Sequence, residues 1–172
     1  MKYILLTIIS LLSVPFAVLA ESSETKIHRA MAAAPPSVSQ QATIMDSDGT
    51  ILQKGTNSWT CMPDTMPGDK APMCNDVLWM KMMSAVGSKA DFTAKGIGIS
   101  YMLKGDIGSG VSNSTPYHQD HKNAHDYTET GPHLMIIVPK EMLKGITRDP
   151  KTGGPYVMWG DTPYAHIMVP IK

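Results

Sequence analysis

Two segments near the end of the chain share one residue pattern, and both predict β-strands. Residues 132–139 read PHLMIIVP and residues 165–170 read AHIMVP. Each segment has a histidine, an aliphatic residue, a methionine, further aliphatic residues and a closing proline. Side chains of a strand alternate between its two faces, so the histidine and the methionine of each segment share a face. If the two strands are neighbours, both pairs lie on one surface of a sheet.

That surface would combine two ligand types that suit a soft metal ion. His133 and His166 supply imidazole nitrogen, the commonest metal ligand, and Met135 and Met168 supply thioether sulfur, which favours Cu(I). We therefore expect a site for a metal ion, copper or zinc, or for a small ligand at these four residues. The alternative is that each histidine begins a strand and bonds only to a turn carbonyl.

A second group of histidines lies in the long polar segment 104–131. On a helix, spacings of three and seven residues place His118, His121 and His125 on one face, where they could bind zinc or copper. The glutamate of the HExxH pattern is absent, so the segment does not indicate a metalloprotease. A mobile surface loop is the alternative interpretation.

The only two cysteines, Cys61 and Cys74, predict a disulfide that closes a short proline-rich loop. Their spacing is neither CxxC nor a usual zinc pattern, although a redox or metal pair is the competing interpretation. The loop cannot be regular structure, because it contains three prolines. It also carries Met62, Met66 and Met73, which could hold Cu(I) or simply cover an adjacent core.

The first residues predict export. Lys2 precedes an apolar stretch over residues 4–18, and Val18-Leu19-Ala20 supplies the small residues of a cleavage site. We interpret residues 1–20 as a signal peptide and expect a periplasmic or secreted protein with no membrane anchor after cleavage. Without Lys2 the basic count falls from 15 to 14, against 15 acids, a net charge of −1. A near-neutral chain is a poor nucleic-acid binder, because phosphate contacts require a basic surface.

The rest of the chain predicts an α+β fold with one domain over residues 42–172 after a flexible N-terminal arm over residues 21–41. Asp48-Gly49 predicts a hairpin turn between short apolar runs. Asn75 is a candidate N-cap for one helix that ends near Gly87. We expect a mainly antiparallel sheet of five or six strands with this principal helix packed on it. The later strands are expected at residues 96–103, 133–138, 156–159 and 165–169.

Five segments of the chain resemble an uncharacterised family of small exported bacterial proteins. They read TNSWTCMPD (56–64), PMC (72–74), GPH (131–133), DPKTGGPYVMW (149–159) and GDTPYAHIMVP (160–170). The family pattern is TNGWTCxPD, PMC, a YML strand, PHxM and GGPxxMWxGTPYxHxMVP, and Ser58 stands here in place of the usual glycine. The resemblance implies a shared fold and export but no activity. Its pattern includes both cysteines, His133 and His166, and it omits the loop histidines.

Two further functions compete with a binding module. A hydrolase could use His133 or His166 as a general base assisted by Asp64 or Tyr164, although no nucleophile motif is present. A structural or interaction protein of the cell envelope could use its aromatic side chains as a contact surface. The aromatic candidates are Trp59, Tyr156, Trp159 and Tyr164. Nothing in the sequence predicts an oligomeric state.

Overall fold

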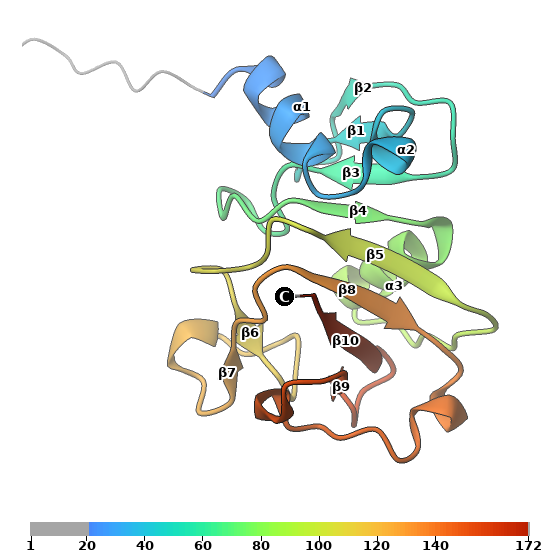
Figure 1. Ribbon diagram of the computed structural model, residues 1–172, viewed down its shortest axis with the longest axis vertical. Helices are drawn as coiled ribbons and strands as arrows, with labels where there is room; N and C mark the ends of the chain where they lie inside the picture. The colour runs from blue at the N-terminus through green and yellow to red at the C-terminus, as the bar shows by residue number, and fades with distance from the viewer. Residues whose placement is uncertain (1–20, 172) are drawn as a thin grey trace, which may run out of the picture.

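The computed structural model describes residues 21–171, and the predicted signal peptide lies outside this range. An eight-stranded mixed sheet runs through the molecule in the order β2-β1-β3-β4-β5-β8-β10-β9, with helix α3 behind it (Figure 1). The α+β class is as predicted, but the five or six expected strands are too few. The strands of the sheet are β1 (Thr43–Met45), β2 (Ile51–Gln53), β3 (Thr60–Met62), β4 (Met73–Asn75), β5 (Gly98–Met102), β8 (His133–Ile137), β9 (Tyr156–Met158) and β10 (His166–Pro170).

The helical elements are short apart from α3. They are α1 (Ser23–Met31), α2 (Pro36–Ser39), α3 (Val77–Ser88) and the 3-10 turns η1 (His121–Asn123), η2 (Lys140–Leu143) and η3 (Pro150–Thr152). None of the helices within residues 21–171 combines the length and apolarity that a membrane crossing requires.

The predicted hairpin is confirmed, and its first strand adds a feature that the sequence did not indicate. β1 and β2 pair antiparallel, with Gly49 in the turn at φ 87°. β1 also pairs with β3 in parallel, so the sheet is mixed rather than wholly antiparallel. This parallel pair extends the sheet beyond the strands predicted from the apolar runs.

The predicted disulfide between Cys61 and Cys74 is confirmed, but its surroundings correct the expectation of an irregular loop. The two cysteines lie directly opposite each other on the antiparallel strands β3 and β4. Only the segment between these strands is irregular, and its prolines all fall there. Both cysteines are fully buried beneath α1.

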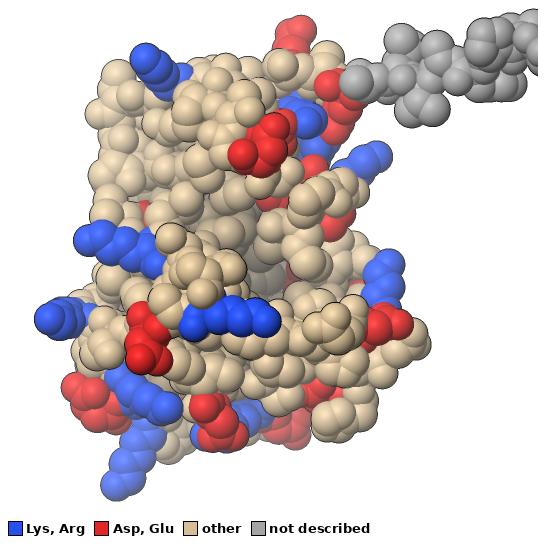
Figure 2. Space-filling view, turned by 180° about the vertical axis from the view of Figure 1, so that it is seen from behind, with Lys and Arg blue, Asp and Glu red and all other residues tan. Residues whose placement is uncertain are grey.

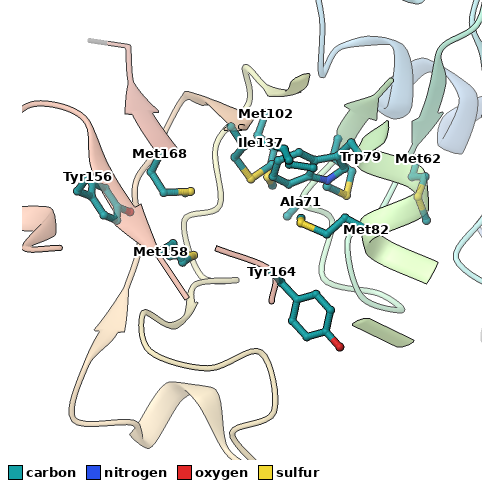
Figure 3. Packing of buried hydrophobic residues seen from close by; sticks show 12 residues of the cluster. Met62, Ala71, Trp79, Met82, Met102, Ile137, Tyr156, Met158, Tyr164 and Met168 are labelled. Carbon is teal, nitrogen blue, oxygen red and sulfur yellow. The ribbon is translucent and has the colours of Figure 1, made fainter. Parts of the chain in front are cut away.

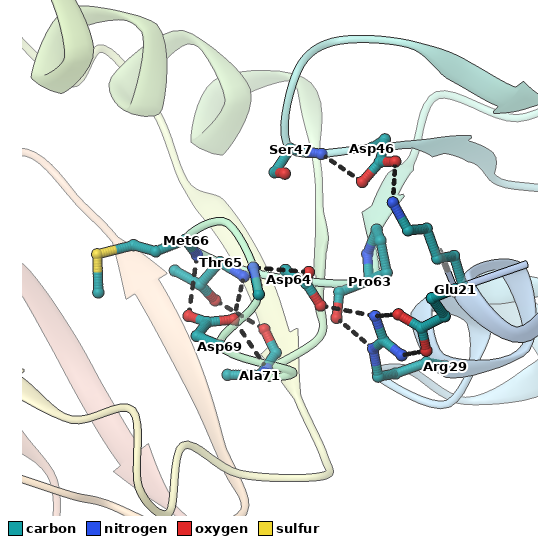
Figure 4. Close-up of polar contacts among 12 residues, drawn as sticks. Glu21, Arg29, Asp46, Ser47, Pro63, Asp64, Thr65, Met66, Asp69 and Ala71 are labelled. Atoms are coloured by element: carbon teal, nitrogen blue, oxygen red, sulfur yellow. Dashed lines mark hydrogen bonds and ion pairs between the residues drawn. The ribbon is translucent and has the colours of Figure 1, made fainter. Parts of the chain in front are cut away.

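The segment expected to be a flexible arm is folded. Ser22 caps α1, accepting a hydrogen bond from the backbone N–H of Thr25, and Ala30 and Ala33 pack without exposure against the disulfide region. Small side chains allow this close approach, and Ile27 and Met31 complete the apolar side of the helix. Arg29 fixes α1 further, because its guanidinium donates to the buried carboxylate of Asp64 at 2.8 Å (Figure 4).

Helix α3 begins one residue later than predicted. Asp76, not Asn75, is its N-cap: one carboxylate oxygen accepts the N–H of Trp79 at 2.8 Å and the other accepts the N–H of Ile99 at 2.7 Å. Asn75 instead ends β4, where its side-chain oxygen accepts a hydrogen bond from Ser100. The helix continues past Gly87 and ends at Lys89 in the left-handed region, φ 54°. Asp76 thus joins the helix to β5.

The segment 104–131 is ordered rather than an open loop. It contains a small two-stranded sheet, β6 (Val111–Ser112) with β7 (Tyr127–Thr128), and the turn η1. Asp106 accepts backbone N–H groups of Thr130 and Gly131, which closes the base of the segment. Trp159 attaches it to β9, because the indole donates to the carbonyl oxygen of Ser112 at 3.0 Å.

Candidate binding cavity

The structure brings the two repeated segments together as neighbouring antiparallel strands. Met135 of β8 lies directly opposite Met168 of β10, and His133 lies opposite Pro170. Because residues two apart share a face, both methionines and both histidines lie on the face of the sheet that α3 covers. All four predicted site residues are buried, with exposed fractions between 1% and 6%.

The antiparallel register separates the two histidines along the strands. Ile167 of β10 lies opposite Ile136 of β8, so His166 comes one position further, level with Ile137. Ile137 is four residues from His133 along β8. Four residues span about 13 Å at roughly 3.3 Å per residue. The imidazoles therefore lie at opposite ends of the row, with Met135 and Met168 between them.

Each imidazole has one nitrogen engaged and one free. Nδ1 of His133 lies 2.6 Å from the carbonyl oxygen of Gly131, and Nδ1 of His166 lies 2.9 Å from that of Tyr164. A carbonyl oxygen only accepts, so both Nδ1 atoms carry the proton and both Nε2 atoms have a lone pair. Both Nε2 atoms are buried without a hydrogen-bond partner. Bonding to turn carbonyls therefore satisfies only one of the two nitrogen atoms of each ring.

Burial keeps both rings neutral. Desolvation lowers the pKa of His133 below its ordinary value and lowers the pKa of His166 to about 4. The hydrogen bonds to Gly131 and Tyr164 oppose the shift without reversing it. At neutral pH each Nε2 is available as an uncharged electron-pair donor, which is the form that binds metals.

Both histidines line a cavity of about 220 Å³ between the sheet and α3. The molecule is hollowed on its rear face, and the walls of the hollow are mostly uncharged (Figure 2). Met158 and Met168 from the sheet and Met82 from α3 turn their sulfur atoms toward one another (Figure 3). Eight methionines line the cavity in all: Met66, Met73, Met82, Met83, Met102, Met135, Met158 and Met168.

Two tryptophans flank His166. The ring of Trp79 lies 5.1 Å from the imidazole and that of Trp159 lies 5.0 Å from it, both edge-to-face. Trp159 is positioned by its hydrogen bond to Ser112, whereas the buried Nε1 of Trp79 has no partner. The His166 end of the cavity is therefore walled by two indoles.

The loop histidines are arranged differently. Nδ1 of His118 accepts the backbone N–H of Asp120, and Nδ1 of His121 accepts that of Ser112, so both lone pairs are engaged. The two rings are 6.0 Å apart, and His125 lies on an exposed turn outside the short helix η1. Within residues 21–171 no group of three or more His, Cys, Asp or Glu side chains could hold a metal ion.

The residues proposed for hydrolysis or for a contact surface are hydrogen-bonded or packed within the fold. Asp64 bonds to Arg29, and the hydroxyl of Tyr164 donates to the carbonyl oxygen of Ala90 at 2.7 Å. Tyr156 and Tyr164 are only 1% and 3% exposed, which leaves them outside any contact surface. Trp59 is half-buried against Tyr101.

Several residues that line the cavity were not predicted as site residues from sequence, among them two strand methionines and two residues of α3. Met102 and Met158 lie on predicted strands, opposite His133 and His166 respectively, but their partners depend on register. Trp79 and Met82 lie on the predicted helix, and their apolar pattern indicates only burial. Comparison of the chain with protein-family models, with curated proteins and with solved structures finds no match.

Proposed function

We propose that this protein is an exported binding module that holds copper as Cu(I) in the methionine-lined cavity. The observation that carries the proposal is the pair of buried, neutral imidazoles that line the cavity and whose Nε2 atoms have no hydrogen-bond partner. A buried acceptor without a partner costs free energy, and a ligand at Nε2 would recover it. Export is supported by the disulfide and by the signal-peptide pattern of residues 1–20.

The donor set favours copper over zinc. Structural zinc sites use three or four ligands from cysteine, histidine, aspartate and glutamate. Here both cysteines are disulfide-bonded, and the side chains around the two histidines are mainly thioethers. Thioether sulfur is a soft ligand that suits Cu(I).

One observation supports a second candidate, a small organic ligand. The cavity is largely apolar and has the unpartnered Nε1 donor of Trp79 as well as two nitrogen acceptors. An apolar molecule with one donor and one acceptor group could satisfy these atoms.

The test is a titration of Cu(I), in ascorbate and in competition with a chromophoric chelator. We compare the wild type with the double variant His133→Asn, His166→Asn. Asparagine keeps an N–H near the position of Nδ1, so the turn hydrogen bonds are conserved while both Nε2 atoms are lost. We expect the double variant to bind Cu(I) at least about 100-fold more weakly.

His118→Asn is the matched control, because it changes a loop histidine outside the cavity, and wild-type affinity is expected. Equal Cu(I) affinity of the wild type and a folded double variant would contradict the proposal. Zn(II) binding that depends on the same two histidines would contradict the choice of metal.

A further inference from the structure

We propose that the cavity holds two separate Cu(I) ions, one at each end, each bound by one histidine and two methionines. This inference rests on the proposed function. Its basis is the register of four neighbouring strands, which surrounds each histidine with its own pair of thioethers.

The first set is built on β5 and β8. Met102 lies directly opposite His133, and Met135 lies two residues further along β8. Directly opposed residues share a face and have Cβ atoms about 5 Å apart, so both thioethers are within reach of an ion at Nε2 of His133. All three residues line the cavity and are at least nine-tenths buried.

The second set repeats this arrangement on β9 and β10. Met158 lies directly opposite His166, and Met168 lies two residues further along β10. These three residues also line the cavity and are buried. Each set thus has the same composition: a histidine, its cross-strand methionine and the methionine two residues later on its own strand.

The separation of the two sets argues against one shared ion. The histidines differ by four positions along the ladder, about 13 Å, and also lie on different strands. A metal–nitrogen bond is only about 2 Å long, so one ion needs both Nε2 atoms within about 4 Å of each other. Side chains stand roughly perpendicular to a sheet, so the register holds the Cα atoms of the two histidines far beyond this distance.

The surroundings make the two ends distinguishable. Asp106 lines the cavity and acts electrostatically on His133, favouring positive charge at that end. Trp79 and Trp159 flank His166 instead, within 5.1 Å between ring centroids. An ion at the His166 end therefore lies beside two fluorescent indoles.

The test measures Cu(I) stoichiometry and tryptophan fluorescence in the wild type, in His133→Asn and in His166→Asn. We expect two equivalents for the wild type and one for each single variant. The fluorescence change should persist in His133→Asn and be lost in His166→Asn. Met102→Leu and Met158→Leu keep the side-chain volume. Each should weaken the binding of only the Cu(I) ion at its own end of the cavity.

The outcomes separate this inference from the proposed function. A single equivalent in the wild type, whether lost in one or in both histidine variants, would overturn the two-ion arrangement and leave Cu(I) binding intact. No histidine-dependent binding in the wild type would overturn both. Two equivalents with the expected division among the variants would establish the arrangement.

Discussion

Burial of the His166 imidazole couples folding to pH. The ring is 1% exposed, and its pKa falls from 6.5 to about 4 in the folded protein. Between these values the unfolded chain binds a proton that the folded chain does not, so stability is complete above pH 6.5 and is lost as the pH falls toward 4. We expect a loss of about 2 kcal/mol between pH 7 and pH 4.5 from this residue, measured by urea unfolding.

His166→Asn is the comparison for this prediction, because it removes the titrating group and keeps a donor for the carbonyl of Tyr164. Its stability should fall less steeply with decreasing pH, whatever its stability at pH 7. His133 contributes in the same direction, since burial also lowers its pKa. An equally steep decline in His166→Asn would show that other groups cause the acid sensitivity.

Arg29 makes the ion pair whose loss should matter most. Its guanidinium donates to the Asp64 carboxylate at 2.8 Å and to the carbonyl oxygen of Pro63 at 3.0 Å, with the Asp64 side chain 6% exposed. Arg29→Met keeps the apolar stem and leaves a buried carboxylate without its cationic partner, with only the N–H of Gly68 still donating to it. We expect a loss of about 3 kcal/mol in the free energy of unfolding, measured by urea denaturation.

The surface pair between Arg148 and Asp161 supplies the control, because these side chains are 57% and 83% exposed. Arg148→Met should leave the free energy of unfolding nearly unchanged, since solvent screens exposed pairs. Similar losses in the two variants would show that Asp64 is not buried as the structure describes.

At the scale of the elements, local signals predicted the strands whose sequences are distinctive and missed those that depend on partners. β8 and β10 were predicted from aliphatic runs bounded by prolines. β3 and β4 were missed because each has three residues and gains its regularity by pairing across the disulfide. α1 was missed because most of its residues are polar, although Ile27, Ala30 and Met31 on its packed side have helical spacing.

The N-cap residue of α3 also connects the helix to β5. Asp76 accepts N–H groups from Trp79 and from Ile99, so one side chain begins the helix and holds β5 beside it. Asp76→Ala should lower the free energy of unfolding by about 2 kcal/mol, since both N–H groups lose their acceptor.

Asp76→Asn tests the double role, because an amide retains one acceptor oxygen and loses the other. We expect an intermediate loss in the same urea experiment. If asparagine is as destabilising as alanine, the negative charge rather than the number of acceptors explains the effect of this residue.

At the scale of the whole molecule, the sequence predicted which residues share a surface but not how they are arranged. Alternation along a strand placed His133 with Met135 and His166 with Met168. Their positions at opposite ends of a row follow from the antiparallel register, which depends on contacts between residues distant in sequence. The cavity itself requires α3 and segment 104–131 to assemble over the sheet, which no local pattern encodes.

The attachment of segment 104–131 to α3 should control how readily the cavity opens. Pro116 and His121 of this segment line the cavity. The hydroxyl of the adjacent Tyr117 lies 3.0 Å from the Val86 carbonyl oxygen and 3.0 Å from the Tyr164 hydroxyl. Tyr117→Phe removes this donor and should make local opening easier.

The loss of this hydrogen bonding should give roughly fivefold faster hydrogen exchange of the backbone amides in residues 111–118, measured by mass spectrometry. Tyr101→Phe is the matched control, because Tyr101 packs on Trp59 on the opposite face of the sheet and should leave these amides unchanged. Unaltered exchange in Tyr117→Phe would mean that the Trp159 contacts alone hold the segment over the cavity. The rate at which a ligand enters would then depend on Trp159, whose backbone N–H donates to the carbonyl oxygen of Asn113 and whose indole donates to that of Ser112.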